Sequence, residues 1–231
     1  MHILLIGSGG REHALAWKLG QSPRISRLSV TGDNPGFPLD ATRVQGDPVA
    51  YANAQGVDLV VVGPEAPLAE GVSDRLREAG VLVFGPSQSA ARLESSKAFA
   101  KGFMDRHSIP TAGWSVHDDL EGALAAVAGP CVVKADGLAA GKGVIVAADQ
   151  ESAREGVREV FSGRFGSAAD QVVLEELLVG PEVSVLAFCD GTKAVPLLSC
   201  RDHKRRFDGD AGPNTGGMGA ICPAPGVGSA E

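Results

Sequence analysis

Two lysines and a run of glycine and alanine residues form the segment of this sequence with the clearest chemical potential. Lys134 precedes the run and Lys142 lies inside it, between Gly141 and Gly143, with β-branched residues on both sides. Small residues let backbone N–H groups approach an anion, and lysine ammonium groups supply positive charge to it. The flanking runs have the composition of strands, so the pattern predicts a hairpin that folds over a phosphate group. The alternative is a Gly-rich hairpin with solvated lysines.

This segment does not match the Walker A motif, which requires G-x-x-x-x-G-K-[ST] at the start of a helix. The spacing from Gly137 to Gly141 is one residue too short, Gly143 replaces the hydroxyl residue, and a strand follows. A phosphate-binding flap between two strands is therefore predicted.

A second anion site is predicted near the N-terminus, where Gly7, Gly9 and Gly10 follow an apolar run. Glu12 stands where the dinucleotide fingerprint G-x-G-x-x-G requires its third glycine, so that fingerprint fails. Backbone amides at a helix N-terminus can still bind phosphate, and Arg11 can add a bidentate contact. The alternative is an exposed arginine in the first turn of a helix.

A third candidate site is an acidic segment that follows an apolar run. It contains Glu175 and Glu176 before a turn and Glu182 after it. Carboxylates and free backbone groups suit the amino group of adenine and the hydroxyls of ribose. The alternative is a solvated strand edge.

The elements that must position these groups begin with an alternation of strands and helices. This alternation predicts a doubly wound α/β domain with a parallel sheet, whose ligand site lies at the carboxyl ends of its strands. The expected strands are 2–6, 28–31, 57–62 and 81–84, and the expected helices are 11–19 and 69–79.

A long helix is expected over 88–106, and Pro110 marks a boundary after it because proline disfavours a helix before it. A small α+β lobe that carries the flap should follow, and after it another sheet begins. The expected elements of the lobe are strands 131–134, 144–147 and 171–176 and helix 151–161, and those of the next sheet are strands 183–188 and 194–198. The pattern predicts three domains, at 1–107, 108–182 and 183–231.

Composition limits the function classes. The 231 residues carry a formal net charge of −7, and the only dense basic run is 201–206, which argues against a long nucleic-acid groove. The cysteines show no C-x-x-C spacing, which argues against a zinc site and a disulfide framework and favours reduced thiols in the cytoplasm. The apolar run at the N-terminus is too short for a signal sequence or a membrane span.

Five ordered segments together resemble the phosphoribosylamine–glycine ligase family, also called glycinamide ribonucleotide synthetase, of the ATP-grasp superfamily. The segments are Gly7-Ser8-Gly9-Gly10-Arg11-Glu12-His13-Ala14, Val62-Gly63-Pro64-Glu65-Ala66-Pro67-Leu68, residues 135–144, Asp202-His203-Lys204-Arg205 and Gly212-Pro213-Asn214-Thr215-Gly216-Gly217-Met218-Gly219-Ala220.

The resemblance implies a Rossmann-like, pre-ATP-grasp parallel sheet followed by an incomplete ATP-grasp domain with a small flap lobe. It also implies the ligation of glycine to 5-phosphoribosylamine in purine biosynthesis. ATP would phosphorylate the glycine carboxylate, and the amine would attack the glycyl phosphate, which releases ADP and phosphate. The implied ligands are these small molecules and Mg²⁺, with neither nucleic acid nor membrane as a partner.

The resemblance also implies roles for individual residues. The ATP site would contain Lys97, Lys101, Lys134, Gly137, Gly141, Lys142, Gly143, Glu175, Glu176, Leu177 and Glu182. The phosphate and amine substrate would contact Gly9, Gly10, Arg11, Glu65, Pro67, Gly216, Gly217 and Met218. Asp202, Lys204, Arg205 and Asn214 would face the acyl phosphate and the attacking amine.

The chain departs from the family pattern in two places. Residues 32–36 replace a Pro-Gly-Asn-Ala-Gly-like loop, which puts substrate contacts there in doubt. The sequence stops at Glu231, before the acidic and Asn residues that hold magnesium in this family, so no metal ligand is expected within it. The expectation is that these 231 residues alone are not a competent ligase and that the missing half lies on a longer chain or a partner.

Two other functions are compatible with parts of the sequence. Another ATP-grasp carboxylate–amine ligase is the nearest alternative, and a non-catalytic nucleotide-binding fragment is the alternative from a different class. A Rossmann dehydrogenase is disfavoured by Glu12 and because Gly32 precedes Asp33 in a turn, which leaves no acidic residue at the end of the second strand.

Overall fold

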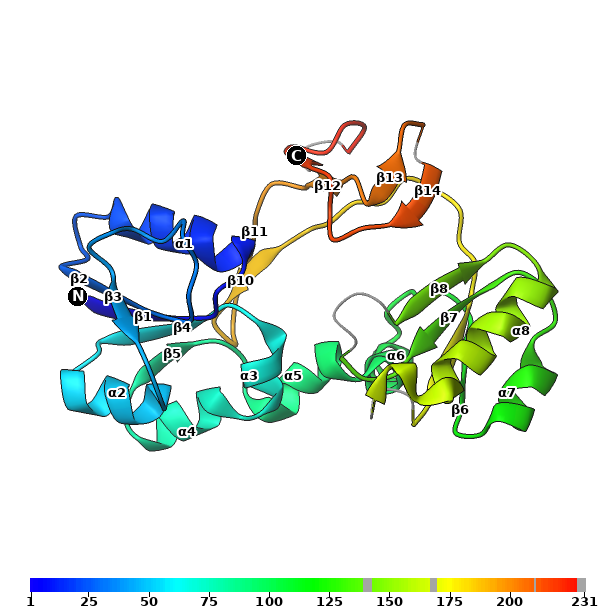
Figure 1. Ribbon diagram of the computed structural model, residues 1–231, viewed down its shortest axis with the longest axis horizontal. Coiled ribbons are helices and arrows are strands. Elements are labelled where there is room, and N and C mark those ends of the chain that lie inside the picture. The colour runs from blue at the N-terminus through cyan, green and yellow to red at the C-terminus, as the bar shows by residue number, and fades with distance from the viewer. Residues whose placement is uncertain (139–142, 167–169, 210, 228–231) are drawn as a thin grey trace. The chain divides into compact units, whose positions relative to one another are not determined.

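Five parallel strands form the first sheet of the computed structural model, which describes residues 1–138, 143–166, 170–209 and 211–227 (Figure 1). The strands are β1 (His2–Ile6), β2 (Arg27–Thr31), β3 (Thr42–Val44), β4 (Leu59–Val62) and β5 (Leu82–Phe84), in the order β3-β2-β1-β4-β5. The chain runs outward from β1 on one side and returns to β4 on the other. The loops after β1 and β4 therefore meet at the topological switch point, where open parallel sheets bind ligands.

Helices cover both faces of this sheet, and the buried strand β1 contributes alternate residues to each face. Ile3 and Leu5 pack with Ala16 of α1 (Gly10–Gly20). Leu4 and Ile6 belong to the cluster formed with α2 (Pro48–Gln55) and α4 (Val72–Glu78). The continuous apolar run that predicted this strand is thus explained by burial on both faces.

Two expected helices differ in the structure. The helix expected over 69–79 is α4, which begins at Val72 after Gly71 in a left-handed conformation with φ 83°, and the loop expected before it contains α3 (Glu65–Ala69). The helix expected over 88–106 is α5 (Gln88–Ser95) and α6 (Lys97–Arg106). Ser96 between them is extended at φ −137°, and its hydroxyl accepts a hydrogen bond from Phe99 N at 3.0 Å, so it caps α6.

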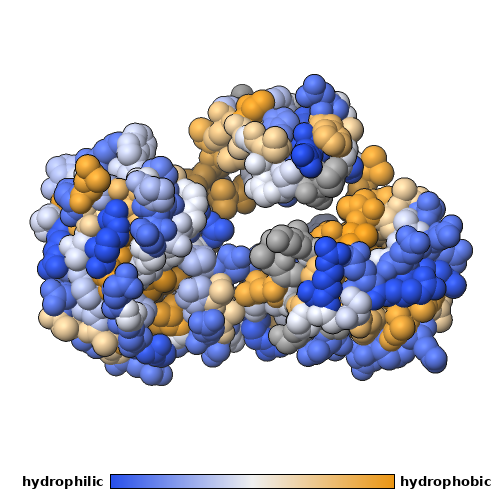
Figure 2. Space-filling model, in the orientation of Figure 1, coloured by the Kyte–Doolittle hydropathy of each residue, from blue (hydrophilic) through white to orange (hydrophobic). Residues whose placement is uncertain are grey.

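Four strands form a second, antiparallel sheet in the order β6-β9-β7-β8: β6 (Trp114–His117), β7 (Cys131–Ala135), β8 (Val144–Ala147) and β9 (Val172–Glu176). Helices α7 (Leu120–Ala126) and α8 (Gln150–Glu159) cover one face, where Ala123 and Val157 pack against Val133 and Val172. A π-helical turn (Val160–Arg164) continues α8. The outer face of α8 carries hydrophilic side chains (Figure 2). The hairpin strands and α8 confirm the sequence pattern, whereas β3, α2, β6 and α7 were not predicted.

The chain divides into two compact units, Met1–Leu177 and Leu178–Glu231. Within residues 178–209 and 211–227, the second unit contains three antiparallel strand pairs. These pairs are β10 (Ala187–Cys189) with β11 (Ala194–Pro196), β12 (Arg201–Asp202) with β15 (Ala220–Ile221), and β13 (Arg205–Phe207) with β14 (Ala211–Asn214). The boundaries of the three domains expected from the sequence remain a prediction. None of the helices in the described part of the chain is long and apolar enough to span a membrane.

Candidate functional site

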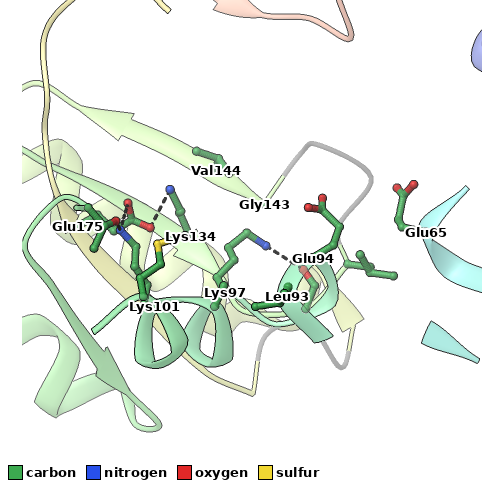
Figure 3. Close-up of a pocket in the computed structure, with 14 residues that line it drawn as sticks. Glu65, Leu93, Glu94, Lys97, Lys101, Lys134, Gly143, Val144 and Glu175 are labelled. Atoms are coloured by element: carbon green, nitrogen blue, oxygen red, sulfur yellow. Dashed lines mark hydrogen bonds and ion pairs between the residues drawn. The ribbon is translucent and has the colours of Figure 1, made fainter. Parts of the chain in front are cut away.

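A pocket of about 470 Å³ in the first unit brings together three lysines that the sequence singled out (Figure 3). Lys97 and Lys101 come from α6, and Lys134 comes from β7. Gly137 and Gly143, at the two ends of the Gly-rich loop, also line the pocket. Its volume is in the usual range for small-molecule sites. Gly141 and Lys142 lie outside the described residues.

Glu175 on β9 binds two of these lysines at once. Its Oε2 lies 2.9 Å from Lys101 Nζ, and its Oε1 lies 2.7 Å from Lys134 Nζ. The side chains of Glu175 and Lys101 are each only 8% exposed, whereas that of Lys134 is 25% exposed. Lys101 Nζ also donates to Thr111 Oγ1 at 2.7 Å, which fixes the ammonium from a second side.

The two ammonium groups determine the protonation state of this carboxylate. Burial by itself raises the pKa of Glu175, but the hydrogen bonds and charges of Lys134 and Lys101 outweigh burial, and the pKa lies below its ordinary value. Glu175 is therefore a carboxylate that holds two cations in place. Both carboxylate oxygens of Glu175 face lysines, and the adenine and ribose contact that the family resemblance implied for Glu175 stays a prediction.

Lys97 has different surroundings. Its ammonium donates to the carbonyl oxygens of Asp136 at 3.3 Å and Gly137 at 3.1 Å, and it points toward the side of the pocket where Glu94 lies (Figure 3). Burial lowers the pKa of Lys97, Asp136 partly opposes this shift, and the nearby Lys134 adds to it. Carbonyl oxygens carry only partial charge, so an anion in the pocket would stabilise this ammonium more strongly.

Asp136 ties the base of the Gly-rich loop to the N-terminus of α6. Its side chain accepts hydrogen bonds from Ala98 N at 2.7 Å and from Ser96 Oγ at 3.0 Å. Ala135 N donates to Gly143 O at 2.8 Å and closes the base of the hairpin. A negative charge at a helix N-terminus is favourable, so the hairpin and the lysine-bearing helix are held in one arrangement. Neither Asp136 nor Ser96 was a predicted site residue, although a serine before Lys97 is a helix N-cap signal.

The N-terminal turn contains a buried acid. Glu12 is 3% exposed, and its Oε2 accepts a hydrogen bond from Gly9 N at 2.7 Å. A Cβ on Gly63 would lie 2.1 Å from Glu12 Oε1, and one on Gly7, with φ 117°, would lie 2.7 Å from Glu12 Cγ. Glu12 thus fills the space between the loops after β1 and β4. This packing explains why glutamate stands where the dinucleotide fingerprint has glycine.

Arg11 joins the same two loops. Its Nη1 donates to Gly63 O at 2.5 Å, and its Nη2 lies 3.8 Å from Glu65 Oε2. The side chain is 62% exposed and remains accessible to a ligand. Gly9, Gly10, Arg11 and Glu65 therefore lie together at the switch point, and Pro67 follows in α3.

The predicted catalytic segments lie together in the second unit. Asp202 is next to Gly217, where a Cβ would lie 3.1 Å from Asp202 Oδ1. Lys204 forms an ion pair with Glu182, and Arg205 Nη1 donates to Gly212 O at 3.2 Å.

Backbone hydrogen bonds connect the same segments. Met218 N donates to His203 O at 2.7 Å, and Thr215 Oγ1 donates to Lys204 O at 2.9 Å. Gly216 lies between Thr215 and Gly217, whereas the side chain of Asn214 is outside the described part. In the first unit, Glu176 Oε2 accepts a hydrogen bond from Gly113 N at 3.2 Å, and Leu177 is the last residue of that unit.

Family models match the whole chain. Residues 1–94 match the phosphoribosylglycinamide synthetase N domain, and residues 95–231 match its ATP-grasp (A) domain. Curated relatives named phosphoribosylamine–glycine ligase include that of Xanthomonas campestris, 53% identical, and that of Mesorhizobium japonicum, 50% identical. Each alignment covers 97% of this chain and 55% of the relative, so the chain spans about half the length of these proteins.

Solved structures give the same result. The crystal structure of phosphoribosylamine–glycine ligase from Thermotoga maritima is 34% identical with a TM-score of 0.79, over 95% of this chain and 55% of that one. N5-carboxyaminoimidazole synthetase from Staphylococcus aureus, complexed with ADP, is 17% identical with a TM-score of 0.65, over 88% of this chain and 54% of that one. At this identity the second likeness concerns the fold alone.

Proposed function

The chain belongs to the phosphoribosylglycinamide synthetase family, and on this premise we propose that it takes part in the ATP-dependent ligation of glycine to 5-phosphoribosylamine. The products are glycinamide ribonucleotide, ADP and phosphate. The expected α/β fold, a Rossmann-like sheet followed by an ATP-grasp domain, is confirmed by the family matches and the T. maritima structure. The observation that carries the proposal is the pocket in which Glu175 arranges Lys101 and Lys134 beside Lys97.

The chemistry of this reaction agrees with such a pocket. A carboxylate accepts an amine poorly until one of its oxygens becomes a good leaving group, and ATP supplies the phosphoryl group that makes it one. Phosphoryl transfer depends mainly on positioning and charge neutralisation, so a cluster of ammonium groups suits it better than a nucleophile does.

We assign the triphosphate to Lys97, Lys101 and Lys134 under the loop that contains Gly137, Gly141, Lys142 and Gly143. Glu175 would then act by positioning Lys101 and Lys134, since its carboxylate contacts both ammonium groups. Glu175, the Leu177 backbone and Glu182 remain the proposed contacts for adenine and ribose, with Glu176 beside them in the ATP site. Closure of the loop would exclude water, which would otherwise hydrolyse the acyl phosphate.

We assign the 5-phosphate of the amine substrate to Gly9, Gly10 and Arg11, with Glu65 and Pro67 beside them. Part of this turn is already engaged, because Glu12 accepts the Gly9 N–H. The exposed guanidinium of Arg11 is therefore the stronger part of this proposed site.

Arg11→Ala is expected to weaken binding of ribose 5-phosphate, a stable analogue of the amine substrate, about tenfold because a charge-assisted contact is lost. Its affinity for ATP should stay unchanged. Calorimetric titrations of both ligands measure this, with the exposed Arg24→Ala as the matched control. Equal loss for both ligands, or none for ribose 5-phosphate, would contradict the assignment.

The acyl phosphate and the attacking amine are assigned to the second unit. Asp202, Lys204, Arg205 and Asn214 are the proposed catalytic residues, and Gly216, Gly217 and Met218 are proposed to contact the substrate. The support is that Asp202 and Gly217 are neighbours, that Arg205 donates to Gly212 O within β14, and that Lys204 O accepts from Thr215 just after β14.

Magnesium is also implied by the family. Among residues 1–138, 143–166, 170–209 and 211–227, no group of three or more His, Cys, Asp or Glu side chains could hold a metal ion. Proteins commonly hold Mg²⁺ through one or two carboxylates together with the phosphates of the substrate, so the residues that would bind it stay a proposal. Mg²⁺, the small-molecule substrates and a cytoplasmic location remain part of the proposal.

The reaction is tested with ATP, glycine and 5-phosphoribosylamine, each omitted in turn, by measuring ADP and glycinamide ribonucleotide. The test requires a protein with the full length of the curated relatives, because this chain spans 55% of that length. Equal amounts of the two products, both dependent on glycine, are expected. Formation of ADP at the same rate without glycine would mean that ATP hydrolysis is not coupled to glycine and would contradict the proposal.

Ser96→Ala separates the role of Ser96 in the site from its role as a cap. It removes the N-cap of α6 and a donor to Asp136, whereas Ser87→Ala removes the N-cap of α5, where Ser87 Oγ accepts from Ala90 N at 3.2 Å. Each change should cost about 1 kcal/mol of unfolding free energy in urea. Only Ser96→Ala should also weaken ATP binding, because it loosens the helix start that carries Lys97. Equal ATP affinities for the two variants would contradict the proposed coupling.

A further inference from the structure

Two cysteines of the second unit are opposite each other where β12 and β15 begin to separate. In this antiparallel pair, Arg201 is opposite Ile221 and Asp202 is opposite Ala220. The same register places Cys200 opposite Cys222, one position beyond the paired residues. Both are free thiols.

The backbone hydrogen bonds identify the type of this cysteine pair. Cys200 donates its N–H to Ser184 O and accepts from Ser184 N, both at 2.8 Å, so its backbone groups point away from β15. His203 N donates to Gly219 O at 2.9 Å, which fits the alternation expected of an antiparallel ladder. Cys200 and Cys222 therefore occupy a non-hydrogen-bonded position, where Cα atoms lie about 4.5 Å apart. Disulfides accept Cα separations of about 4.4 to 6.8 Å.

The surroundings of the thiols give the order in which they would react. Cys222 is exposed and Cys200 is half-buried, so a reagent reaches Cys222 first. The strand register places Cys200 directly opposite this first site of reaction.

We propose that Cys200 and Cys222 are a redox modification site that forms a reversible disulfide when the protein meets a low-molecular-weight disulfide such as glutathione disulfide. The Cys222 thiolate attacks one glutathione sulfur, which forms a mixed disulfide and releases one glutathione thiolate. The Cys200 thiolate then attacks Cys222 Sγ, which forms the Cys200–Cys222 bond and releases the second glutathione. The two protein thiols lose two protons and two electrons, and glutathione disulfide gains them.

A Cys200–Cys222 bond would enclose the segment that carries the proposed catalytic residues. Residues 201–221 lie between the two cysteines and include Lys204, Arg205 and Met218. A disulfide would join the two ends of this segment covalently. Disulfides of this kind in reducing compartments are usually transient and responsive rather than structural. The inference depends on strand register and does not require the proposed ligase reaction.

The sequence allows a direct test by mass spectrometry. Trypsin cleaves after Lys193, Arg201 and Arg206, so Cys200 and Cys222 fall on separate peptides, and Cys189 falls on a third. The folded chain is incubated with glutathione disulfide, alkylated and digested without reduction. A linked Cys200–Cys222 peptide is expected at about tenfold or more the amount of any Cys189-linked peptide, since a neighbouring thiol has a high effective concentration. Dithiothreitol should reverse the link.

Matched variants make the result decisive. Cys200→Ser should leave Cys222 as a stable glutathione adduct, whereas Cys189→Ser should leave the linked peptide unchanged, because Cys189 is opposite Ala194. The proposal is overturned if the wild-type chain accumulates as much Cys222 adduct as Cys200→Ser without a linked peptide. It is also overturned if the linked peptide appears only when the chain is unfolded in urea.

Discussion

Replacing Glu175 with glutamine is expected to lower the free energy of unfolding of this chain by about 3 kcal/mol. The amide has nearly the same shape, so the loss comes from charge: two ammonium groups at 2.9 Å and 2.7 Å would share a buried site without their counter-ion. Removing one member of a buried ionic cluster leaves its partners uncompensated, which costs far more than losing a surface ion pair. Removing one partner of a buried ion pair costs about 3 to 5 kcal/mol. Because Lys134 is partly exposed, we expect a loss at the low end of this range.

Fluorescence of Trp114 provides a local measure of this change, because Trp114 is opposite Glu175 in the pairing of β6 with β9. Urea titrations in a Trp17→Phe background would isolate its signal from that of the other tryptophan. The matched control is Glu176→Gln, at the exposed next position of β9. Equal urea midpoints for the two variants would show that Glu175 does not hold the lysine cluster together.

Acid supplies a second test of the same ion pairs. The folded-state pKa of Glu175 lies below its ordinary value of 4.5, so its stabilising contribution is complete above pH 4.5. This contribution is lost as the pH falls through the lowered pKa. The stability difference between the wild-type chain and Glu175→Gln should therefore shrink on acidification below pH 4.5, whereas a difference that does not depend on pH would point to packing alone.

Lys97→Ala is expected to weaken ATP binding by between about tenfold and a hundredfold, the value of one charge-assisted hydrogen bond to phosphate. Lys97 contacts carbonyl oxygens rather than a carboxylate. A phosphate can therefore pair with the full positive charge of this ammonium without displacing an existing ion pair. Lys134 must first give up part of its contact with Glu175, so Lys134→Ala should have the smaller effect. Calorimetric titration with ATP measures both, with the exposed Lys18→Ala as the control.

Lys142→Ala should also weaken ATP binding if the Gly-rich loop closes on the triphosphate. Lys142 lies outside the described residues, so this expectation depends on the sequence alone. Unchanged affinity in Lys142→Ala together with a loss in Lys97→Ala would keep the pocket and reject the flap. Unchanged affinity in both variants would reject the nucleotide assignment.

Alkaline pH should reproduce part of the Lys97→Ala effect. The folded-state pKa of Lys97 is below its ordinary value of 10.5, so its ammonium loses its proton earlier than that of an unperturbed lysine. ATP affinity should fall as the pH rises through this lowered pKa, and Lys97→Arg should shift the fall to higher pH because arginine stays protonated. The effect of Lys97 on the free energy of unfolding has the opposite sign. Between the lowered pKa and 10.5 the unfolded chain binds more protons than the folded chain, so the free energy of unfolding rises with pH.

Local sequence patterns predicted most strands of the first sheet, the flap hairpin and the family. Continuous apolar runs such as 2–6 predicted strands buried on both faces, and β1 is such a strand with helices on each side. The β-branched runs around the Gly-rich loop predicted the hairpin of β7 and β8. The ordered motifs indicated the family that the two family models confirm. Such features depend on local composition and periodicity, which a single sequence carries.

Only the tertiary structure decided which distant groups become partners. The sequence pattern did not indicate that Glu175 lies between Lys101 and Lys134, an arrangement that strand pairing produces. Asp136 was not singled out, yet it caps a helix that begins almost forty positions earlier. Glu12 violated a fingerprint because packing between two loops requires its side chain. These contacts join residues far apart in the sequence, and strand order and burial select them, so no local pattern encodes them.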